Sequence, residues 1–223
     1  MIPRTVQTKK LPLFKVEKDF RERLNKEQPM GKKPKKGITP KHLRPDQLVY
    51  QLKVSLKGIK PPIWRRIQVT GDTTLDVLHA IIQTAMGWFG EHLYEFEIYE
   101  ETYGDPSMLE DAIDEKTVNL SQLISLEKEK FRYVYDFGDN WEHDILVEKI
   151  LPIEKGTHYP VCIVGKRACP PEDCGGPFGY GDLLEILKDP DNPEHEDKFE
   201  WLPGDFDTEK FDIEYVNRQL GGS

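Results

Sequence analysis

Apolar residues at every second position constrain the fold of this chain more than any other feature of its sequence. From residue 50 to residue 56, four apolar side chains alternate with polar ones, which is the pattern of a strand buried on one face. Related runs occupy residues 63–69, 93–99, 131–137, 141–150 and 159–164. The tripeptide Gly138-Asp139-Asn140 joins two of these runs as the turn of a hairpin would. The sequence therefore predicts a mainly antiparallel sheet.

Few helices are expected around this sheet. One amphipathic helix should occupy about residues 73–86, with Asp72 or Thr73 as its N-cap. Two more are expected at residues 182–188 and 208–220, separated by an acidic stretch that contains prolines. The chain has neither βαβ alternation nor a glycine-rich phosphate-binding motif. We therefore predict an α+β fold, in which the early amphipathic helix and the C-terminal helices pack against the sheet.

Charge is distributed unevenly along the 223 residues, whose formal net charge is -9. Residues 1–45 contain fourteen lysines and arginines against four acidic residues, whereas residues 46–223 contain seventeen against thirty-six. We interpret the first segment as a basic, flexible N-terminal arm and the second as the folded domain. An acidic domain repels a phosphate backbone, so contact with nucleic acid is expected only through the arm. Residues 100–115, with seven acidic side chains and no basic one, are expected to form a solvated loop.

The chain carries no sequence signal for a membrane or for export. No apolar run approaches the length of a membrane span, and the first residues lack the apolar stretch of a secretory signal. Three cysteines, an odd number, argue against a disulfide framework. We therefore predict a cytoplasmic protein with no membrane partner.

The predicted hairpin tip holds one set of candidate functional residues. Asp136 and Asp139, with His143 close by, have the side chains of a hard-metal site or of a general acid and base. They are the candidate catalytic residues of a metal-dependent hydrolase that acts on phosphoesters. The structural alternative is that Asp and Asn are favoured in turns because they bond to nearby backbone N–H groups. Both interpretations are open at this point.

The three cysteines form a second candidate set. Cys162, Cys169 and Cys174, with His158, could supply the four ligands of a tetrahedral zinc site. The alternative is an ordered loop with buried thiols, stiffened by its two prolines. Acidic neighbours at positions 172 and 173 disfavour a thiolate and therefore a cysteine nucleophile. We expect no cofactor, with zinc or another divalent metal as the alternative.

Aromatic and basic side chains form a third set, of candidate binding residues. Some lie on the predicted strands and others in or just after the predicted helix. They are Trp64, Arg66, His79, Trp88, His92, Tyr135 and Trp141. Arg66 shares a strand face with Trp64, which would suit contact with an anion, whereas Arg65 should point to the opposite face. The histidines could converge in space, or each could be a hydrogen-bonded core residue.

Seven motifs in this order resemble the plasmid pRiA4b ORF-3-like family over about residues 46–220. They are Pro62-Ile-Trp-Arg-Arg66, Leu78-His79, Gly87-Trp88, His92-Leu93, Tyr135-Asp-Phe-Gly-Asp139, Trp141-Glu-His143 and Cys169-Pro-Pro-Glu-Asp-Cys-Gly-Gly176. The resemblance implies an α+β domain that occurs on plasmids and transposable elements and has no assigned activity. Some members carry a resolvase label, but this chain offers no nucleophilic serine among clustered arginines, so recombinase activity is not carried over.

Three functions follow from these observations. The acidic balance of the domain favours a non-enzymatic binding or accessory module, associated with mobile elements, that engages a basic protein or peptide. The metal-dependent hydrolase and a structural zinc-binding domain are the alternatives. A bound metal would favour one of the alternatives, and convergence of the histidines on a cleft would favour an enzyme.

Overall fold

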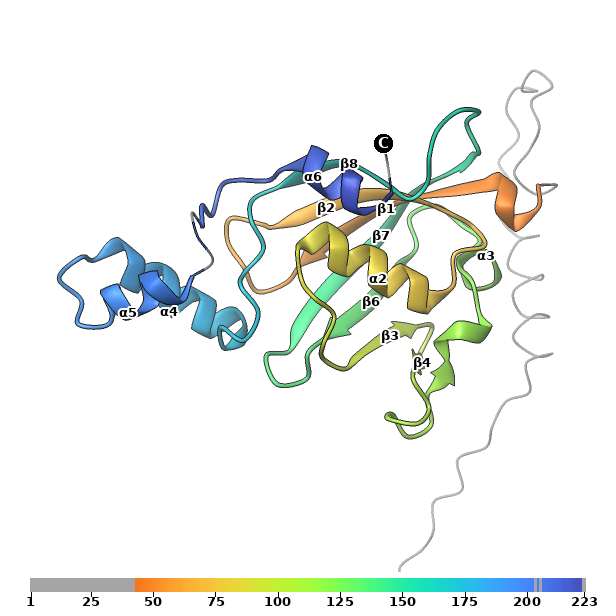
Figure 1. Cartoon of the computed structure of the whole chain (residues 1–223). Coiled ribbons are helices and arrows are strands. Elements are labelled where there is room, and N and C mark those ends of the chain that lie inside the picture. Colours follow the sequence, from red (N-terminus) through yellow and green to blue (C-terminus); the bar gives the residue numbers. More distant parts are fainter. Residues whose placement is uncertain (1–42, 203, 205, 222–223) are drawn as a thin grey trace, which may run out of the picture. The chain divides into compact units, whose positions relative to one another are not determined.

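The computed structural model describes residues 43–202, 204 and 206–221, and the predicted basic arm lies almost wholly outside them. Eight strands form one sheet in the order β5-β4-β3-β6-β7-β1-β2-β8 (Figure 1). The strands are β1 (Leu48–Leu56), β2 (Trp64–Thr70), β3 (Tyr94–Ile98), β4 (Glu101–Gly104), β5 (Ile113–Asp114), β6 (Lys130–Tyr135), β7 (Trp141–Pro152) and β8 (Val161–Lys166). All neighbouring pairs are antiparallel except β4 and β5. The predicted sheet and the α+β class are confirmed.

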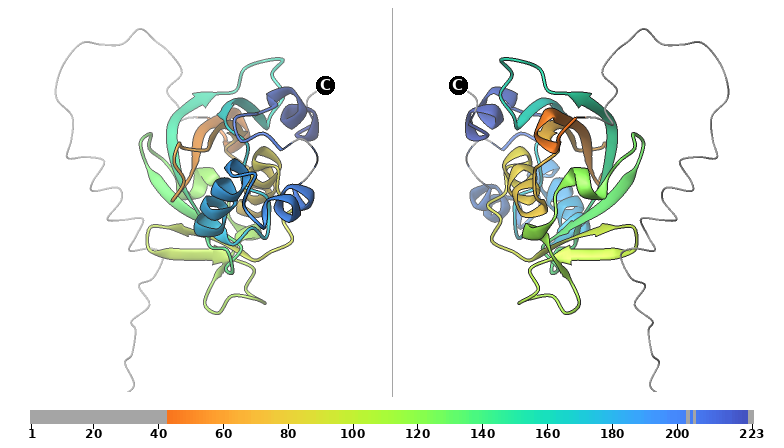
Figure 2. Two further views of the ribbon diagram at one scale, coloured as in Figure 1. Left: turned by 90° about the vertical axis from the view of Figure 1, so that its left-hand side faces the viewer. Right: turned by 90° about the vertical axis from the view of Figure 1, so that its right-hand side faces the viewer.

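Helices and short 3-10 turns connect and flank the strands. They are α2 (Leu75–Met86), α3 (Leu120–Leu123), α4 (Gly176–Lys188), α5 (His195–Trp201) and α6 (Ile213–Gln219), with 3-10 turns at Pro45–Gln47 and Glu115–Thr117. Two further views show the helices gathered to one side of the curved sheet (Figure 2). Within the described part of the chain, no helix is long and apolar enough to cross a membrane.

The central strands β1 and β7 are the longest, and their alternating apolar side chains form the core. Leu52 pairs with Val147 and Val54 with Ile145, and all four are at most 1% exposed. Helix α2 covers this face with its own apolar side chains, among them Leu78, which is fully buried. Burial of each such side chain contributes about 1.5–3 kcal/mol, so the period-two pattern determines which face becomes the core.

Helix α2 begins slightly later than the sequence suggests. The carbonyl of Thr74 accepts the N–H of Leu78 and Thr74 is the N-cap, whereas Asp72 or Thr73 was expected. Thr73 is already used in the preceding turn, because its N–H bonds to the carbonyl of Thr70 and its own carbonyl accepts the N–H of Leu120. The helix ends as expected at Gly87, whose φ of 93° is the left-handed conformation that favours glycine.

Three expectations about irregular segments need correction. Residues 100–115 contain β4 and β5, because Tyr103 is buried and pairs with Phe96 on β3, so the segment adds to the sheet despite its acidic residues. Helix α4 starts at Gly176 rather than at residue 182, since its glycine-rich first turns hid the helical pattern. The acidic stretch before the last helix contains α5, and α6 begins at Ile213 instead of residue 208.

The opposite face of the sheet is polar. Arg66 on β2 forms an ion pair with Glu148 on β7, and Lys57 forms one with Glu142. Arg132 on β6 bridges Glu142 and Glu97. These side chains stay partly exposed, so the pairs organise a solvated surface more than they stabilise the fold.

Candidate functional site

Three loops meet at the edge of the sheet where β6 ends and β7 begins. They are the α2–β3 loop (residues 87–93), the hairpin turn (residues 136–140) and the cysteine loop (residues 169–176). The indole N–H of Trp88 donates to the carbonyl of Pro170 at 2.8 Å, and the hydroxyl of Tyr135 donates to Glu172. The carboxylate of Asp139 accepts the N–H of Gly175 at 3.1 Å. The cysteine loop is thereby held to both of the other loops.

Two glycines let the cysteine loop approach its neighbours this closely. A Cβ at Gly176, whose φ is +68°, would lie 2.3 Å from the carbonyl oxygen of Asp139. A Cβ at Gly179 would lie 2.0 Å from the carbonyl oxygen of Cys174. Real Cβ atoms do not come that near to backbone oxygens, so a side chain at either position would displace the loop.

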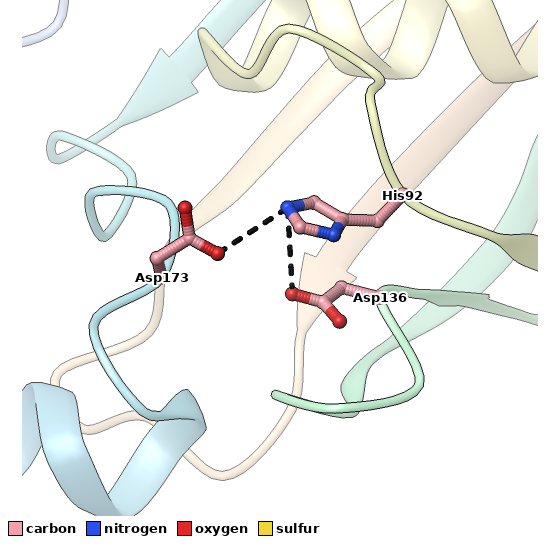
Figure 3. A group of neighbouring side chains, drawn as sticks. All are labelled: His92, Asp136 and Asp173. Atoms are coloured by element: carbon pink, nitrogen blue, oxygen red, sulfur yellow. Dashed lines mark ion pairs between the residues drawn. The ribbon is translucent and has the colours of Figure 1, made fainter.

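Each of the three loops contributes one side chain to a cluster of His92, Asp136 and Asp173 (Figure 3). The Nε2 atom of His92 lies 3.3 Å from Asp173 Oδ1 and 3.8 Å from Asp136 Oδ2. Among the described residues, no other group of three or more His, Cys, Asp or Glu side chains brings its ligand atoms within 4.8 Å of one another. Two of its members, His92 and Asp136, were candidates from the sequence. Asp173 was missed, because no spacing rule links it to them.

Two of the other histidines, His79 and His143, lie among aromatic rings. His79 stacks on Tyr94 with ring centroids 3.6 Å apart, and its Nδ1 lies 2.7 Å from the hydroxyl of Tyr133. The ring of His143 lies 5.2 Å from that of Tyr133 and 5.5 Å from that of Trp88. Ring contacts thus link all of the predicted binding residues on this side of the sheet, and they are His79, Trp88, His92, Tyr135 and Trp141.

Burial keeps the two deeper histidines uncharged. It lowers the pKa of His79 to about 4 and that of His143 to about 4. His143 is fully buried, and neither of its ring nitrogens forms a hydrogen bond with a described residue. The backbone at Tyr133 and Trp141 raises the pKa of His143 and so offsets part of the lowering caused by burial, although the geometry falls short of a hydrogen bond.

The proposed catalytic set is therefore only partly brought together. Asp136 reaches the His92 cluster, but Asp139 is occupied with the backbone of Gly175, and His143 packs inside the core. A general base must lie within hydrogen-bond reach of its substrate, and a side chain that is fully enclosed lacks that access. The arrangement gives Asp136 a site and gives Asp139 and His143 structural contacts.

The four predicted zinc ligands do not meet at one point in the structure. Cys162 lies on β8, Cys169 and Cys174 lie in the cysteine loop, and all three are free thiols. His158 lies instead beside Gly221, at the end of α6. Burial raises the pKa of Cys162 to about 11 and those of Cys169 and Cys174 to about 12, which disfavours thiolate chemistry.

The last two predicted binding residues lie on the polar face of the sheet. Arg66 is engaged through Nε and Nη2 by the carboxylate of Glu148, and Trp64 lies beneath the charges of Lys53 and Arg66. Arg65 points to the other face, as expected from strand geometry. There its guanidinium is buried, donates to three backbone carbonyls and lies 4.0 Å from the ring centre of Phe211.

An open groove of about 1090 Å³ lies between α4, α5 and the cysteine loop. Six carboxylate residues and one lysine contribute to its lining, together with apolar side chains and Trp201. The charged residues are Asp173, Asp182, Glu185, Asp189, Glu194, Asp197 and Lys198. Because Asp173 belongs to both, the groove adjoins the His92 cluster. The acidity of this segment is evident from the sequence, but the groove was not predicted, because α5 was not predicted.

The sheet, helix α2 and the cysteine loop together define an α+β domain of the class expected from the sequence motifs. A model of the family described as "Plasmid pRiA4b ORF-3-like protein" matches residues 48–215. The chain therefore belongs to the plasmid pRiA4b ORF-3-like family.

Two relatives of the chain carry no assigned activity in their descriptions. The uncharacterized protein y4hQ of Sinorhizobium fredii (strain NBRC 101917 / NGR234) is 37% identical over 176 residues, which cover 77% of this chain and 90% of that protein. The crystal structure of MM3350, a protein of unknown function from Methanosarcina mazei Go1, is 45% identical with a TM-score of 0.71. That alignment covers 75% of this chain and 97% of MM3350. The relatives support the fold, and the function must be argued from the site.

Proposed function

We propose that the protein is a non-enzymatic binding module whose acidic groove holds an arginine-rich or lysine-rich segment of a partner protein. The observation that carries this proposal is the excess of six carboxylate residues over one lysine around a single groove. A concave surface lined by one sign of charge concentrates the field and attracts ligands of the opposite sign. Its volume of about 1090 Å³ suits several side chains of an extended segment.

Arginine fits this groove better than lysine does. Trp201 lines the groove and is 46% exposed, so its ring face is accessible to a cation. A guanidinium group stacks on an indole and bonds to a carboxylate in a bidentate manner, whereas an ammonium group is a point charge. We therefore expect a preference for arginine between otherwise identical segments.

Three features support binding rather than catalysis. Burial lowers the pKa of His79 and of His143 to about 4, so both are weak bases at neutral pH, and His143 is enclosed in the core. Burial also raises the pKa of all three thiols, so none is an activated nucleophile. The carboxylate of Asp139 accepts a hydrogen bond from the backbone of the cysteine loop, so it has a structural role.

Two predictions about cellular context accompany the proposal. A cytoplasmic location is supported by the three free cysteines, which a reducing compartment maintains. An association with mobile elements is supported by the family, which is named after a plasmid open reading frame. Both stay predictions.

The test is a titration of the full chain against a fluorescently labelled peptide of arginine and serine, followed by anisotropy. We expect saturable binding that weakens with added salt, with lysine peptides weaker and glutamine peptides inactive. The variant Asp182→Asn, Glu194→Gln, Asp197→Asn should bind about 10-fold more weakly, because each exposed charge contact contributes about 0.2–1 kcal/mol.

The matched control removes three exposed carboxylates elsewhere, as Glu110→Gln, Asp111→Asn, Glu154→Gln, none of which lines the groove. It changes the net charge by the same amount and should leave the affinity within about 2-fold, since screening weakens distant charges. Equal losses in the two variants would show a general charge effect and would contradict a groove that binds the peptide.

A further inference from the structure

We propose that His92, Asp136 and Asp173 bind a divalent first-row transition ion such as Mn²⁺, Co²⁺ or Zn²⁺. This is a second site, and it does not depend on the groove binding a peptide. Figure 3 shows that one imidazole nitrogen faces both carboxylates from separate loops.

The distances from His92 to the two carboxylates suit coordination of one shared ion. Donor atoms about 2.1 Å from one ion lie about 3.4 Å apart in tetrahedral geometry and no more than about 4.2 Å apart in any geometry. The Nε2 atom of His92 lies 3.3 Å from Asp173 Oδ1 and 3.8 Å from Asp136 Oδ2. Both separations fall within that range, and neither contact is a hydrogen bond.

One carboxylate oxygen of Asp136 is free to coordinate an ion. The residue is only 8% exposed, and its Oδ1 accepts the N–H groups of Gly138 and Asp139. Its other oxygen, Oδ2, accepts no hydrogen bond from any residue the structure describes and faces His92 across 3.8 Å. This oxygen keeps some contact with solvent, so an ion can reach it without displacing a protein donor, and a cation there would stabilise the mostly buried carboxylate.

Among the residues that the structure describes, no lysine or arginine neutralises this pair of carboxylates. In the described ranges, neither Asp136 nor Asp173 forms an ion pair with a lysine or an arginine. The carboxylates of Glu172 and Asp139 belong to the same two loops, so the surroundings are negative as well. The local field therefore favours a bound cation.

The donor set selects the kind of ion. Mg²⁺ and Ca²⁺ prefer oxygen ligands throughout, whereas imidazole suits first-row transition ions. Three protein ligands leave at least one position open, and Asp173, whose side chain is 73% exposed, lies on the solvent side. Because Asp173 also lines the groove, the proposed ion would lie next to it.

The cysteine loop acts as the positioning element of this site. Tyr135 precedes Asp136 and donates to Glu172, which precedes Asp173, so this hydrogen bond, together with that from Gly175 to Asp139, fixes the register between the two loops. The ring of His92 packs edge-on against the ring of Tyr135, with centroids 5.8 Å apart. One tyrosine thus orients all three ligands.

The experiment is a calorimetric titration of the chelator-treated full chain with CoCl₂, MnCl₂, CaCl₂ and MgCl₂, together with the absorption spectrum of the cobalt form. We expect one equivalent of Co²⁺ or Mn²⁺ to bind far more tightly than Ca²⁺ or Mg²⁺. His92→Ala, Asp136→Asn and Asp173→Asn should each weaken binding by more than the 10- to 100-fold typical of outer-shell losses. The controls His158→Ala and Glu154→Gln, neither of which lies in the cluster or lines the groove, should bind as the native chain does.

Three results would overturn the proposal. They are no saturable binding of Co²⁺ or Mn²⁺ by the native chain, unchanged affinity in His92→Ala or Asp173→Asn, and a thiolate-to-cobalt charge-transfer band, which would assign the ion to cysteines. Asp173→Asn keeps the test valid if the other variants unfold, because Asp173 is exposed and its replacement leaves the core intact.

Discussion

His143 is the residue whose role in the structure differs most from the role predicted from the sequence. In the sequence it stands two residues after Trp141, next to a turn rich in Asp and Asn, where a catalytic role is reasonable. In the structure it is paired with Tyr133 across β6 and β7 and is fully buried. Its imidazole contributes volume and aromatic contacts to the core, at the cost of two ring nitrogens without hydrogen bonds.

Buried neutral histidines predict that the fold loses stability in mild acid. The pKa of His79 and that of His143 are lowered to about 4, whereas an unfolded histidine has a pKa near 6.5. Between these values the unfolded chain binds more protons, so the free energy of unfolding falls as the pH falls from about 6.5 toward 4. The slope should reach about 1.4 kcal/mol per pH unit for each histidine.

Urea unfolding at several pH values measures this slope. The variant His143→Leu should flatten it by the share of one histidine, and it should keep or raise stability at pH 7, since no hydrogen bond is lost. A slope unchanged in His143→Leu would mean that folding does not lower the pKa of His143, which contradicts the effect assigned to its burial.

At the level of elements, the cysteine loop and the start of α4 depend on glycine at particular points. Gly176→Ala would place a Cβ 2.3 Å from the carbonyl of Asp139 at a φ of +68°. We expect a loss of at least about 2 kcal/mol in the free energy of unfolding, together with a displaced cysteine loop. Thermal or urea unfolding gives the energy, and the affinity for Co²⁺ reports the position of Asp173.

Gly181 offers a matched control on the same helix. A Cβ there would meet nothing within 4 Å, and its φ is not in the left-handed region. Gly181→Ala should therefore stabilise α4 by up to about 1 kcal/mol, because alanine is the better helix former. Similar destabilisation by both substitutions would contradict the role assigned to the close approach at Gly176.

The strands and the first helix were predictable because their signal is local. Tyr50, Leu52 and Leu78 show their buried faces through the periodicity of the sequence alone. The strand at Glu101–Gly104 was missed because its burial rests on pairing with β3, and only Tyr103 and Gly104 are buried in it. The glycines at the start of α4 likewise lower its helical propensity, and packing against the hairpin turn compensates for it.

The candidate site was only half predictable for the same reason. His92 and Asp136 attracted notice as chemical types, but their convergence with Asp173 depends on three loops separated by dozens of residues. Glu172 and Asp173 were interpreted only as neighbours of the thiols. The hydrogen bond from Tyr135 to Glu172 and the glycines that permit close approach have no signature in sequence spacing.

At the scale of the whole molecule, charge is distributed differently over two surfaces. The polar face of the sheet balances its charges internally, through pairs such as Arg66–Glu148 and Lys57–Glu142. The groove beside α4 and α5 is less balanced, since six carboxylate residues and one lysine line it and, of the six, Glu185 is paired with Lys188 of α4. An imbalance confined to one concave surface is the feature on which the proposed binding of a basic segment rests.

Chemical-shift mapping of the full chain, labelled with ¹⁵N, tests that claim most directly. On addition of the arginine–serine peptide, we expect the changes in amide chemical shift to cluster in residues 173–201, on α4, α5 and the end of the cysteine loop. The amide shifts of the polar sheet face should stay unchanged. Shifts concentrated on β2 and β7 around Arg66 and Glu148, or no shifts at saturating peptide, would contradict it.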